Sequence, residues 1–497
     1  MIREKLSIAW FFALEGVLSG AFSACSEIFK ERNGWDEQDF GWMIFICVAA
    51  GIAAVPGVAK LCDRFGSAHV TLVSALLLIG TTPFMAKFTA QDSYLWLIVN
   101  ISIFGVLMAA LDICVNAQAC CFEKLTGQCH MGFMHALYAV GAVLGSLTAG
   151  LLIRLGYSFF QILLLACAIC GVGSLLCLKM ISKDEEERLN AQSSESGGGG
   201  DNQIEFDKLS AAASKILRPL MADVSVPMKT FSSATSGGDS HEKDVELSLS
   251  AVGSSSSYEF LLVDDEDDED QEEIVFNHIA SGNPSHGEAA LPGDTSSSST
   301  REKGYTLLVA LTLTLCVAFL VEGSVGDWGA IFLAEECHVP RASGLDALGF
   351  AVFNTFVVLS RLLSDRSEGL ISRPRLLQLC AVGSLMGFWL TALAPRLASD
   401  KGAEGGSYSA ALILASVGFA VTGLALGPVS AIVMAASGNI KSIDPTAAVS
   451  TVSGVSYFGY LAGPVLLGVI AQHSSLSMAF SLAGILIATV YPLAALM

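Results

Sequence analysis

Long apolar runs separated by short polar stretches make up most of the chain. Each run is close to the length of about 20 residues that an α-helix needs to cross a bilayer. Six runs precede one long polar segment and six follow it, which predicts twelve transmembrane helices in two equal sets. The predicted helices span residues 6–27, 38–61, 69–88, 93–119, 131–153 and 157–180, then 305–333, 346–364, 374–395, 408–436, 446–472 and 474–496.

The long polar segment differs from the rest of the chain in composition. Residues 183–303 hold 26 Asp and Glu against 9 Lys and Arg, whereas the remainder holds 21 acidic and 18 basic residues. The net charge of −20 therefore belongs mainly to this segment. Such a composition buries too little apolar surface to offset the entropy of ordering, so we expect disorder. The predicted organisation is a first six-helix bundle at 1–182, an acidic disordered loop at 183–303 and a second six-helix bundle at 304–497.

The overall composition excludes several classes of protein. With 53% hydrophobic and 15% charged residues, the chain is too apolar for a soluble protein, so we expect it in a lipid bilayer and without nucleic acid. Most of the thirteen cysteines lie in apolar runs, where a free thiol packs as a small hydrophobe. Cys167 and Cys170 have metal or redox spacing but lack a neighbouring polar ligand. We expect no metal, no cofactor and no enzymatic activity.

The acidic loop contains two short patterns that resemble signals. Ser256 precedes Glu259 by three residues, as in acidic-directed phosphorylation sites, and YEFL at 258–261 resembles a tyrosine-type sorting signal. These patterns suggest a regulatory kinase or a sorting adaptor as a partner. A solvated linker without a dedicated site is the simpler alternative. We expect the protein to be a monomer.

Several short patterns occur once in each half, which indicates an internal duplication. Parallel repeats of this kind are one plan for secondary transporters, with the solute site between the halves near the membrane midplane. The repeated patterns are KLCDR at 60–64 with RLLSDR at 361–366, Gly-x-x-x-Gly at 141–145 with 459–463, and Glu-Gly at 15–16 with 322–323.

The same patterns carry a resemblance to a known family. GVAKLCDRFGS at 57–67 resembles the signature loop of the major facilitator superfamily. The stretch at 111–145, together with EGSVGDWGAIFL at 322–333 and GYLAGPVLLGVIA at 459–471, resembles the bacterial branch related to fucose permease. The resemblance implies two six-helix bundles that tilt around a central solute site. It also implies that Asp63 and Arg64 form a cytoplasmic latch, and it extends this role to Asp365 and Arg366. Simple positive-inside anchoring is the alternative for both pairs.

Ionisable residues at membrane depth are costly, so each is a functional candidate. Asp112 and His135 lie at similar distances from the loop near residue 124, which places them at similar depths on neighbouring helices. Asn116 is on the same face as Asp112, and Tyr138 follows His135 by three residues. A carboxylate and an imidazole at one depth could exchange protons. The resemblance implies a solute or proton role for Asp112 and Asn116. A static buried hydrogen bond is the alternative.

Three further acids complete the set within the predicted spans. Glu15 and Glu322 occupy equivalent places in the two halves, and we expect both to line the central cavity. Asp327 follows Glu322 by five residues, so the two side chains point about 140° apart on a straight helix. We therefore expect Asp327 to serve as a gating or hydrogen-bonding residue. Asn354 is a candidate for solute contact, with a helix-to-helix hydrogen bond as the alternative.

The distribution of Lys and Arg in short loops predicts that both termini and the acidic loop are cytoplasmic. The leading functional hypothesis is a secondary active transporter that moves a small polar solute, such as a sugar or related metabolite, by alternating access with H⁺ symport. One alternative is an efflux transporter of drugs or metabolites. The other is a membrane sensor or scaffold that acts through the acidic loop without transport.

Overall fold

The computed structural model describes residues 2–127, 130–196, 294–367, 371–398, 408–440, 443 and 445–496. No strand occurs in these ranges. Eleven helices are long and apolar enough to cross a membrane, and the shorter apolar helix Leu348–Leu363 corresponds to the remaining predicted span. The prediction of an all-α membrane protein with two sets of six spans is confirmed. The chain divides into one compact unit of residues 1–211 with 304–497 and a second unit of 212–303, and nearly all of the second lies outside the described residues.

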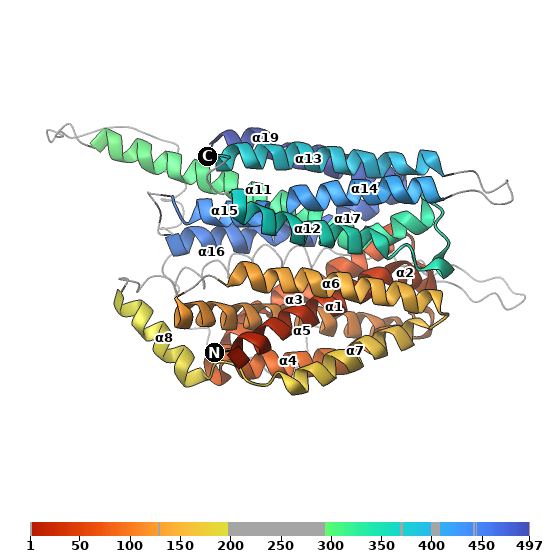
Figure 1. Ribbon diagram of the computed structural model, residues 1–497, viewed down its shortest axis with the longest axis horizontal. Helices are drawn as coiled ribbons and strands as arrows, with labels where there is room; N and C mark the ends of the chain where they lie inside the picture. The colour runs from red at the N-terminus through yellow and green to blue at the C-terminus, as the bar shows by residue number, and fades with distance from the viewer. Residues whose placement is uncertain are drawn as a thin grey trace, which may run out of the picture. The chain divides into compact units, whose positions relative to one another are not determined.

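The helices of the first half follow the predicted order (Figure 1). A short helix, α2, connects the first two spans, and the 3₁₀ turn η1 extends α4. The elements are α1 (Ile2–Ala24), α2 (Ser26–Asn33), α3 (Glu37–Phe65), α4 (Ser67–Thr81), η1 (Thr82–Ala86), α5 (Ala90–Thr126), α6 (Met131–Arg154) and α7 (Phe159–Leu176).

The second half contains more breaks than the first. Proline lacks an amide hydrogen, and the predicted span 408–436 is divided at Gly427 and Pro428. The span 446–472 is divided at Tyr457. The elements are α11 (Asp294–Glu335), η3 (Arg341–Ser343), α12 (Leu348–Ser367), α13 (Arg373–Leu393), η4 (Ala394–Leu397), α14 (Ser409–Leu426), α15 (Val429–Ser437), α16 (Pro445–Ser456), α17 (Phe458–His473), α18 (Leu476–Ala488), α19 (Val490–Leu493) and η5 (Ala494–Leu496).

Side chains at the helix starts explain where several spans begin. An oxygen at the N-cap position accepts one of the amide hydrogens that a first helical turn leaves unpaired. Asp36 accepts from the Asp39 amide at 2.8 Å and starts α3, and Ser475 accepts from the Met478 amide and starts α18. Ser158 and Gln161 form a reciprocal capping box at the start of α7.

The ends of the predicted acidic loop differ from the prediction. Helix α8 (Lys183–Ser196) occupies the first residues of the segment, and α11 begins at Asp294, before the predicted boundary at 304. Three Asp and Glu residues in the first turn of α8 favour a helix, because they complement the positive end of its dipole. Residues 197–293, with the Ser256 and 258–261 patterns, lie outside the described residues.

The two halves contact each other mainly along two pairs of helices. Helix α3 packs against α17, and α6 packs against α12, whose ribbons lie side by side in Figure 1. Within the halves, α1 packs against α6, and α13 packs against both α14 and α18. Helices α3, α6 and α12, which carry several of the predicted site residues, therefore lie where the halves meet.

Candidate solute site between the two halves

Glycines fix the position of α1 against α6. A Cβ atom on Gly16 would lie 2.0 Å from the carbonyl oxygen of Tyr138, and one on Gly141 would lie 2.2 Å from that of Ala13. No side chain fits at such distances, so the two backbones touch directly. This contact holds the neighbouring Glu15 and Tyr138 side chains at one depth.

Glu15 is a buried carboxylate without a counter-charge. It is 7% exposed, and its Oε2 atom has no hydrogen-bond partner in the described part of the chain. Asp112 and Tyr138 lie near Glu15. Burial of a charged carboxylate without a partner costs folding free energy, unless the group is protonated or contacts a ligand.

Asp112 links the two halves. Its Oδ1 atom accepts a hydrogen bond of 2.7 Å from Asn116 in the same helix, as the spacing predicts. Its Oδ2 atom lies 3.5 Å from the hydroxyl of Tyr457, which comes from the junction of α16 and α17 in the second half. The carboxylate of the first half therefore contacts a residue of the second half.

Glu322 lies beside a group of aromatic rings. Tyr460 lies near Glu322, and the Tyr460 ring packs on Gly323, where a Cβ would lie 3.1 Å from the ring. The ring of Phe319 stacks on Tyr460 at 4.6 Å and lies 5.6 Å from the ring of Tyr457. We name Glu15, Asp112, Tyr138, Glu322, Tyr457 and Tyr460 the central cluster.

The structure places the other predicted residues apart from the central cluster. The His135 ring packs edge-on against Phe12 at 5.2 Å, and the charge that acts on His135 is that of Arg361. No hydrogen bond between His135 and Asp112 occurs in the described ranges. Asn354 is buried and donates to the Phe350 carbonyl at 3.0 Å, within its own helix. This hydrogen bond pairs the side-chain amide of Asn354 within its own helix.

Asp327 points away from Glu322, toward the first half. Its charge acts on Cys47 in α3, and the adjacent Gly326 carbonyl accepts a hydrogen bond of 2.5 Å from Ser23 in α1. Helix α11 continues without a break through Gly323, Gly326 and Gly329. Glu322 therefore lies near α17 and Asp327 near α3, although both acids belong to one continuous helix.

Ion pairs join the halves at one end of the helices, which we name the Arg341 end. Lys30 in α2 contacts Glu37 at 2.9 Å and Glu335 at the end of α11 at 2.5 Å. Arg341 of the second half pairs with Glu27 at 2.5 Å and also with Glu31. At the same end Ser146 donates to the Ala347 carbonyl, and Gly150 touches Gly344, whose φ is +64°.

Burial and charge shift the pKa values of this network. Burial and the Glu335 charge raise the pKa of Glu27 to about 7, against the opposing effect of Lys30 and Arg341. Burial acts to lower the pKa of Lys30, but the bonds and charges of Glu335 and Glu37 outweigh it and raise the pKa. Burial also raises the pKa of Asp346 to about 6. The Arg341 end therefore holds a carboxyl that titrates near neutral pH.

The opposite end carries the predicted latch loop, and we name it the Arg64 end. Asp63 and Arg64 are exposed there, and no ion pair of either occurs among the described residues. Instead, Glu186 of α8 accepts from the Ser67 amide at 3.2 Å, and Lys183 donates to the Arg64 carbonyl at 3.0 Å. The Asp365 and Arg366 side chains lie outside the described residues.

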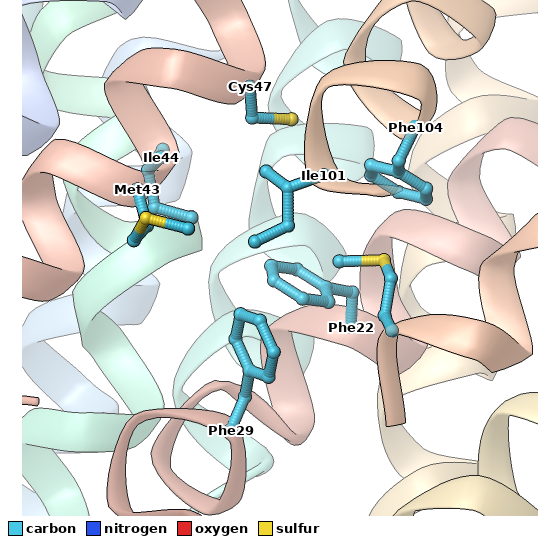
Figure 2. Close-up of a pocket in the computed structure, with 8 residues that line it drawn as sticks. Phe22, Phe29, Met43, Ile44, Cys47, Ile101 and Phe104 are labelled. Atoms are coloured by element: carbon cyan, nitrogen blue, oxygen red, sulfur yellow. The ribbon is translucent and has the colours of Figure 1, made fainter. Parts of the chain in front are cut away.

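The pocket drawn in Figure 2 differs in chemistry from the central cluster. Figure 2 shows Phe22, Phe29, Ile101 and Phe104 around a space between α1, α2, α3 and α5. The complete lining is Phe22, Phe29, Met43, Ile44, Cys47, Met85, Ile101 and Phe104. These side chains offer no oxygen and no charge to a polar solute.

Sequence reasoning missed the aromatic and ion-pair residues. Phe319, Tyr457 and Tyr460 lie in apolar spans, where rings resemble lipid contacts. A signal was available, because Tyr457 and Tyr460 precede and follow Gly459 of the repeated glycine pattern. Lys30 and Arg341 lie between the predicted spans and pair across 305 and 314 residues of sequence.

Known proteins resemble the chain in both sequence and fold. An uncharacterised MFS-type transporter of Yersinia pestis is 22% identical over 492 residues, covering 98% of this chain and 94% of that protein. The membrane protein MosC of Rhizobium meliloti is 23% identical over 167 residues, covering 33% of this chain and 36% of MosC.

Solved transporters share the fold at low identity. A mutant of the nucleoside transporter NupG has a TM-score of 0.60 at 10% identity and covers 99% of both chains. A bacterial homologue of the human drug peptide transporters PepT1 and PepT2 has a TM-score of 0.57 at 14% identity, covering 99% of this chain and 97% of that one. The family model described as the Major Facilitator Superfamily matches residues 6–441. The chain therefore belongs to the Major Facilitator Superfamily.

Proposed function

We propose that the chain is a secondary active transporter that binds a small polar solute at the central cluster and moves it by alternating access. The observation that carries this proposal is the pairing of Asp112 with Tyr457 across the two halves. A site built from both halves changes its geometry when they tilt. This property couples solute binding to the exchange between conformations.

The exposure of Tyr457 supports access to the cluster from one side. Its side chain is 41% exposed although its hydroxyl lies beside Asp112 at the contact between the halves. The ion pairs of Lys30 and Arg341 join the halves at the Arg341 end. With the predicted orientation that end faces away from the cytoplasm, and the conformation is inward-facing.

Asp112 is the proposed site of proton coupling. Among the described residues it hydrogen-bonds only to Asn116 and Tyr457, so no positive side chain fixes its charge. A carboxylate that binds a proton in one conformation and releases it in the other links solute flux to the proton gradient.

The first prediction tests this coupling. Replacing Asp112→Asn should abolish proton-driven accumulation in proteoliposomes, because an amide cannot carry the proton. Counterflow exchange should remain measurable, since it needs no net proton movement. Asp184→Asn, a change in the exposed first turn of α8, serves as the control and should accumulate normally. Accumulation by Asp112→Asn equal to the unmodified protein at every pH would contradict the coupling role.

A ligand screen tests the transport proposal itself. Purified protein is heated with sugars, nucleosides, amino acids, organic acids and amines, and binding of a transported solute should raise the melting temperature. A solute that stabilises the protein should also exchange across proteoliposomes. If no solute of any class binds or exchanges, the transporter proposal fails in favour of a sensor or scaffold.

A further inference from the structure

The central cluster contains three carboxyl groups that no described cationic side chain pairs with. Glu15, Asp112 and Glu322 come from α1, α5 and α11, and within the described ranges none forms an ion pair with Lys, Arg or His within 4.0 Å. Glu15 is more than nine-tenths buried, and its Oε2 atom has no partner there. This unpartnered oxygen lies among Asp112, Tyr138 and Tyr457, whose hydroxyl and carboxylate groups its charge affects.

The cationic groups nearest to the cluster have other partners. His135 packs on Phe12, and the guanidinium of Arg361 donates through Nε to the Gly427 carbonyl at 3.3 Å. Lys30 and Arg341 are paired at the Arg341 end. These four side chains therefore do not neutralise the three carboxylates.

Aromatic rings complete the cluster on the side of the second half. Phe319 stacks on Tyr460 with 21° between the ring planes, and the Tyr457 ring lies 6.2 Å from that of Tyr460. The face of an aromatic ring is negative and attracts a cation within about 6 Å of its centre. Rings and carboxylates together form an environment that favours positive charge.

We propose that the transported solute carries an ammonium group, as a primary amine or a quaternary ammonium, and that this group binds between the carboxylates and the Phe319, Tyr457 and Tyr460 rings. This inference rests on the proposed transport function. A neutral sugar leaves the carboxylates uncompensated, and an anionic solute is repelled by them. An ammonium group supplies the missing positive charge, and its apolar substituents contact the rings.

The first experiment compares matched solutes that differ in charge. Choline and 3,3-dimethylbutan-1-ol have the same shape, but only choline is charged. Tyramine, putrescine and tetraethylammonium are measured beside neutral analogues of similar size. At least one amine should raise the melting temperature of the full-length protein, with an apparent affinity more than tenfold above that of its neutral analogue.

Three variants locate the binding group. Glu322→Gln keeps the shape of the side chain and removes its charge, so amine affinity should fall by tenfold or more. Phe319→Leu should weaken binding by roughly 2- to 30-fold through the loss of one ring. Phe319→Tyr should restore it. Phe84→Leu, a change at an exposed ring in η1, should leave affinity unchanged.

The outcomes separate the two proposals. If a sugar, nucleoside or organic acid binds and no amine does, the ammonium inference is overturned and the transport proposal stands. If amines bind equally well to Glu322→Gln and Phe319→Leu, the inference is likewise overturned, because the ammonium group binds elsewhere. If no solute of any class binds or exchanges, both proposals fail.

Discussion

The α1–α6 pair of the first half and the α11–α17 pair of the second carry the same sequence patterns but differ in their packing. In the first pair, Gly16 meets the backbone of Tyr138, and a Cβ there would lie 2.0 Å from it. In the second pair, the equivalent Gly323 meets the ring of Tyr460, at 3.1 Å from a Cβ. Glu15 has a buried oxygen without a hydrogen-bond partner among the described residues, whereas Glu322 lies near Tyr460.

The difference lies at the Glu-Gly position of each pair. Direct backbone contact leaves no room for α1 to shift against α6. The α11–α17 pair has such a contact as well, because a Cβ on Gly459 would lie 2.1 Å from the carbonyl oxygen of Cys316. At Gly323, however, the neighbour is a ring, which can rotate or slide. The first half also has α8 docked on its α3–α4 turn. We infer that the contact at Gly323 tolerates small shifts that the contact at Gly16 does not.

The largest expected effect comes from adding one methyl group to each helix pair, at Gly16 and at Gly323. Gly16→Ala should destabilise the protein by about 3 kcal/mol, because the backbone of Tyr138 cannot move aside. Gly323→Ala should cost about 1 kcal/mol or less, because the Tyr460 ring can shift. Thermal unfolding in detergent measures both. Gly80→Ala, which meets open space in α4, is the control. Equal losses at Gly16 and Gly323 would remove the basis for assigning different rigidity.

Removing Arg341 should release the second half from the first. Arg341→Ala leaves Glu27, which is 1% exposed, without the guanidinium that pairs with it. Because Arg341 is itself 38% exposed, we expect a cost of about 2 kcal/mol to the closed Arg341 end. Distances between spin labels on α2 and η3 should lengthen. Arg396→Ala, at an exposed arginine in η4, should leave the distances unchanged, and unaltered distances in Arg341→Ala would contradict a holding role.

The closed Arg341 end should also respond to pH. In this conformation the pKa of Glu27 is raised from 4.5 to about 7. Between pH 4.5 and pH 7, closing of the Arg341 end therefore binds up to one proton at Glu27. The stabilisation of the closed Arg341 end by protonated Glu27 is present at low pH and is lost as the pH rises through 7. Lys30 has a raised pKa and stays charged throughout, so it adds no slope.

The same spin labels test this pH dependence. The closed population should increase from pH 8 to pH 5, and Glu27→Gln should remove the Glu27 contribution. Glu31→Gln is the matched control, because Glu31 contacts the same arginine but is 62% exposed. An identical pH response in Glu27→Gln and the unmodified protein would assign the titration to another group.

The smallest expected effect concerns the rigidity of the first half at the Arg64 end. Glu186→Ala removes the carboxylate that accepts from the Ser67 amide at the start of α4. Loss of such a cap costs about 1 kcal/mol. Hydrogen exchange in the first turn of α4 should increase. Glu187→Ala, which removes an exposed neighbour in α8, should have no effect there.

Local sequence patterns predicted the spans well because each span depends on its own apolar length. The break at Gly427 and Pro428 was also predictable, since proline removes a helical hydrogen bond. The pairing of Asp112 with Asn116 follows from helical spacing, and the structure places both as that spacing predicts.

Contacts between distant helices could not be predicted in the same way. Tyr457 contacts Asp112 although the two residues are 345 positions apart in sequence, and no local sequence pattern predicts a contact between such distant residues. Equal depth on neighbouring helices did not bring Asp112 and His135 into contact, because helix rotation also decides where a side chain points. Similarly, Glu27 resembles an ordinary loop acid in sequence, and only the packing of the two halves buries it.

The backbone contact between α1 and α6 also has a consequence for biosynthesis. Helix α1 leaves the ribosome before α6, and its glycine face fits this partner, which is translated more than a hundred residues later. At translation rates of 5–20 residues per second, this interval lasts roughly 6–25 s. During that time Glu15 and the open glycine surface are without α6. The first half therefore completes its core only when its fifth span is inserted, and quality-control factors have that interval in which to recognise an unfinished chain.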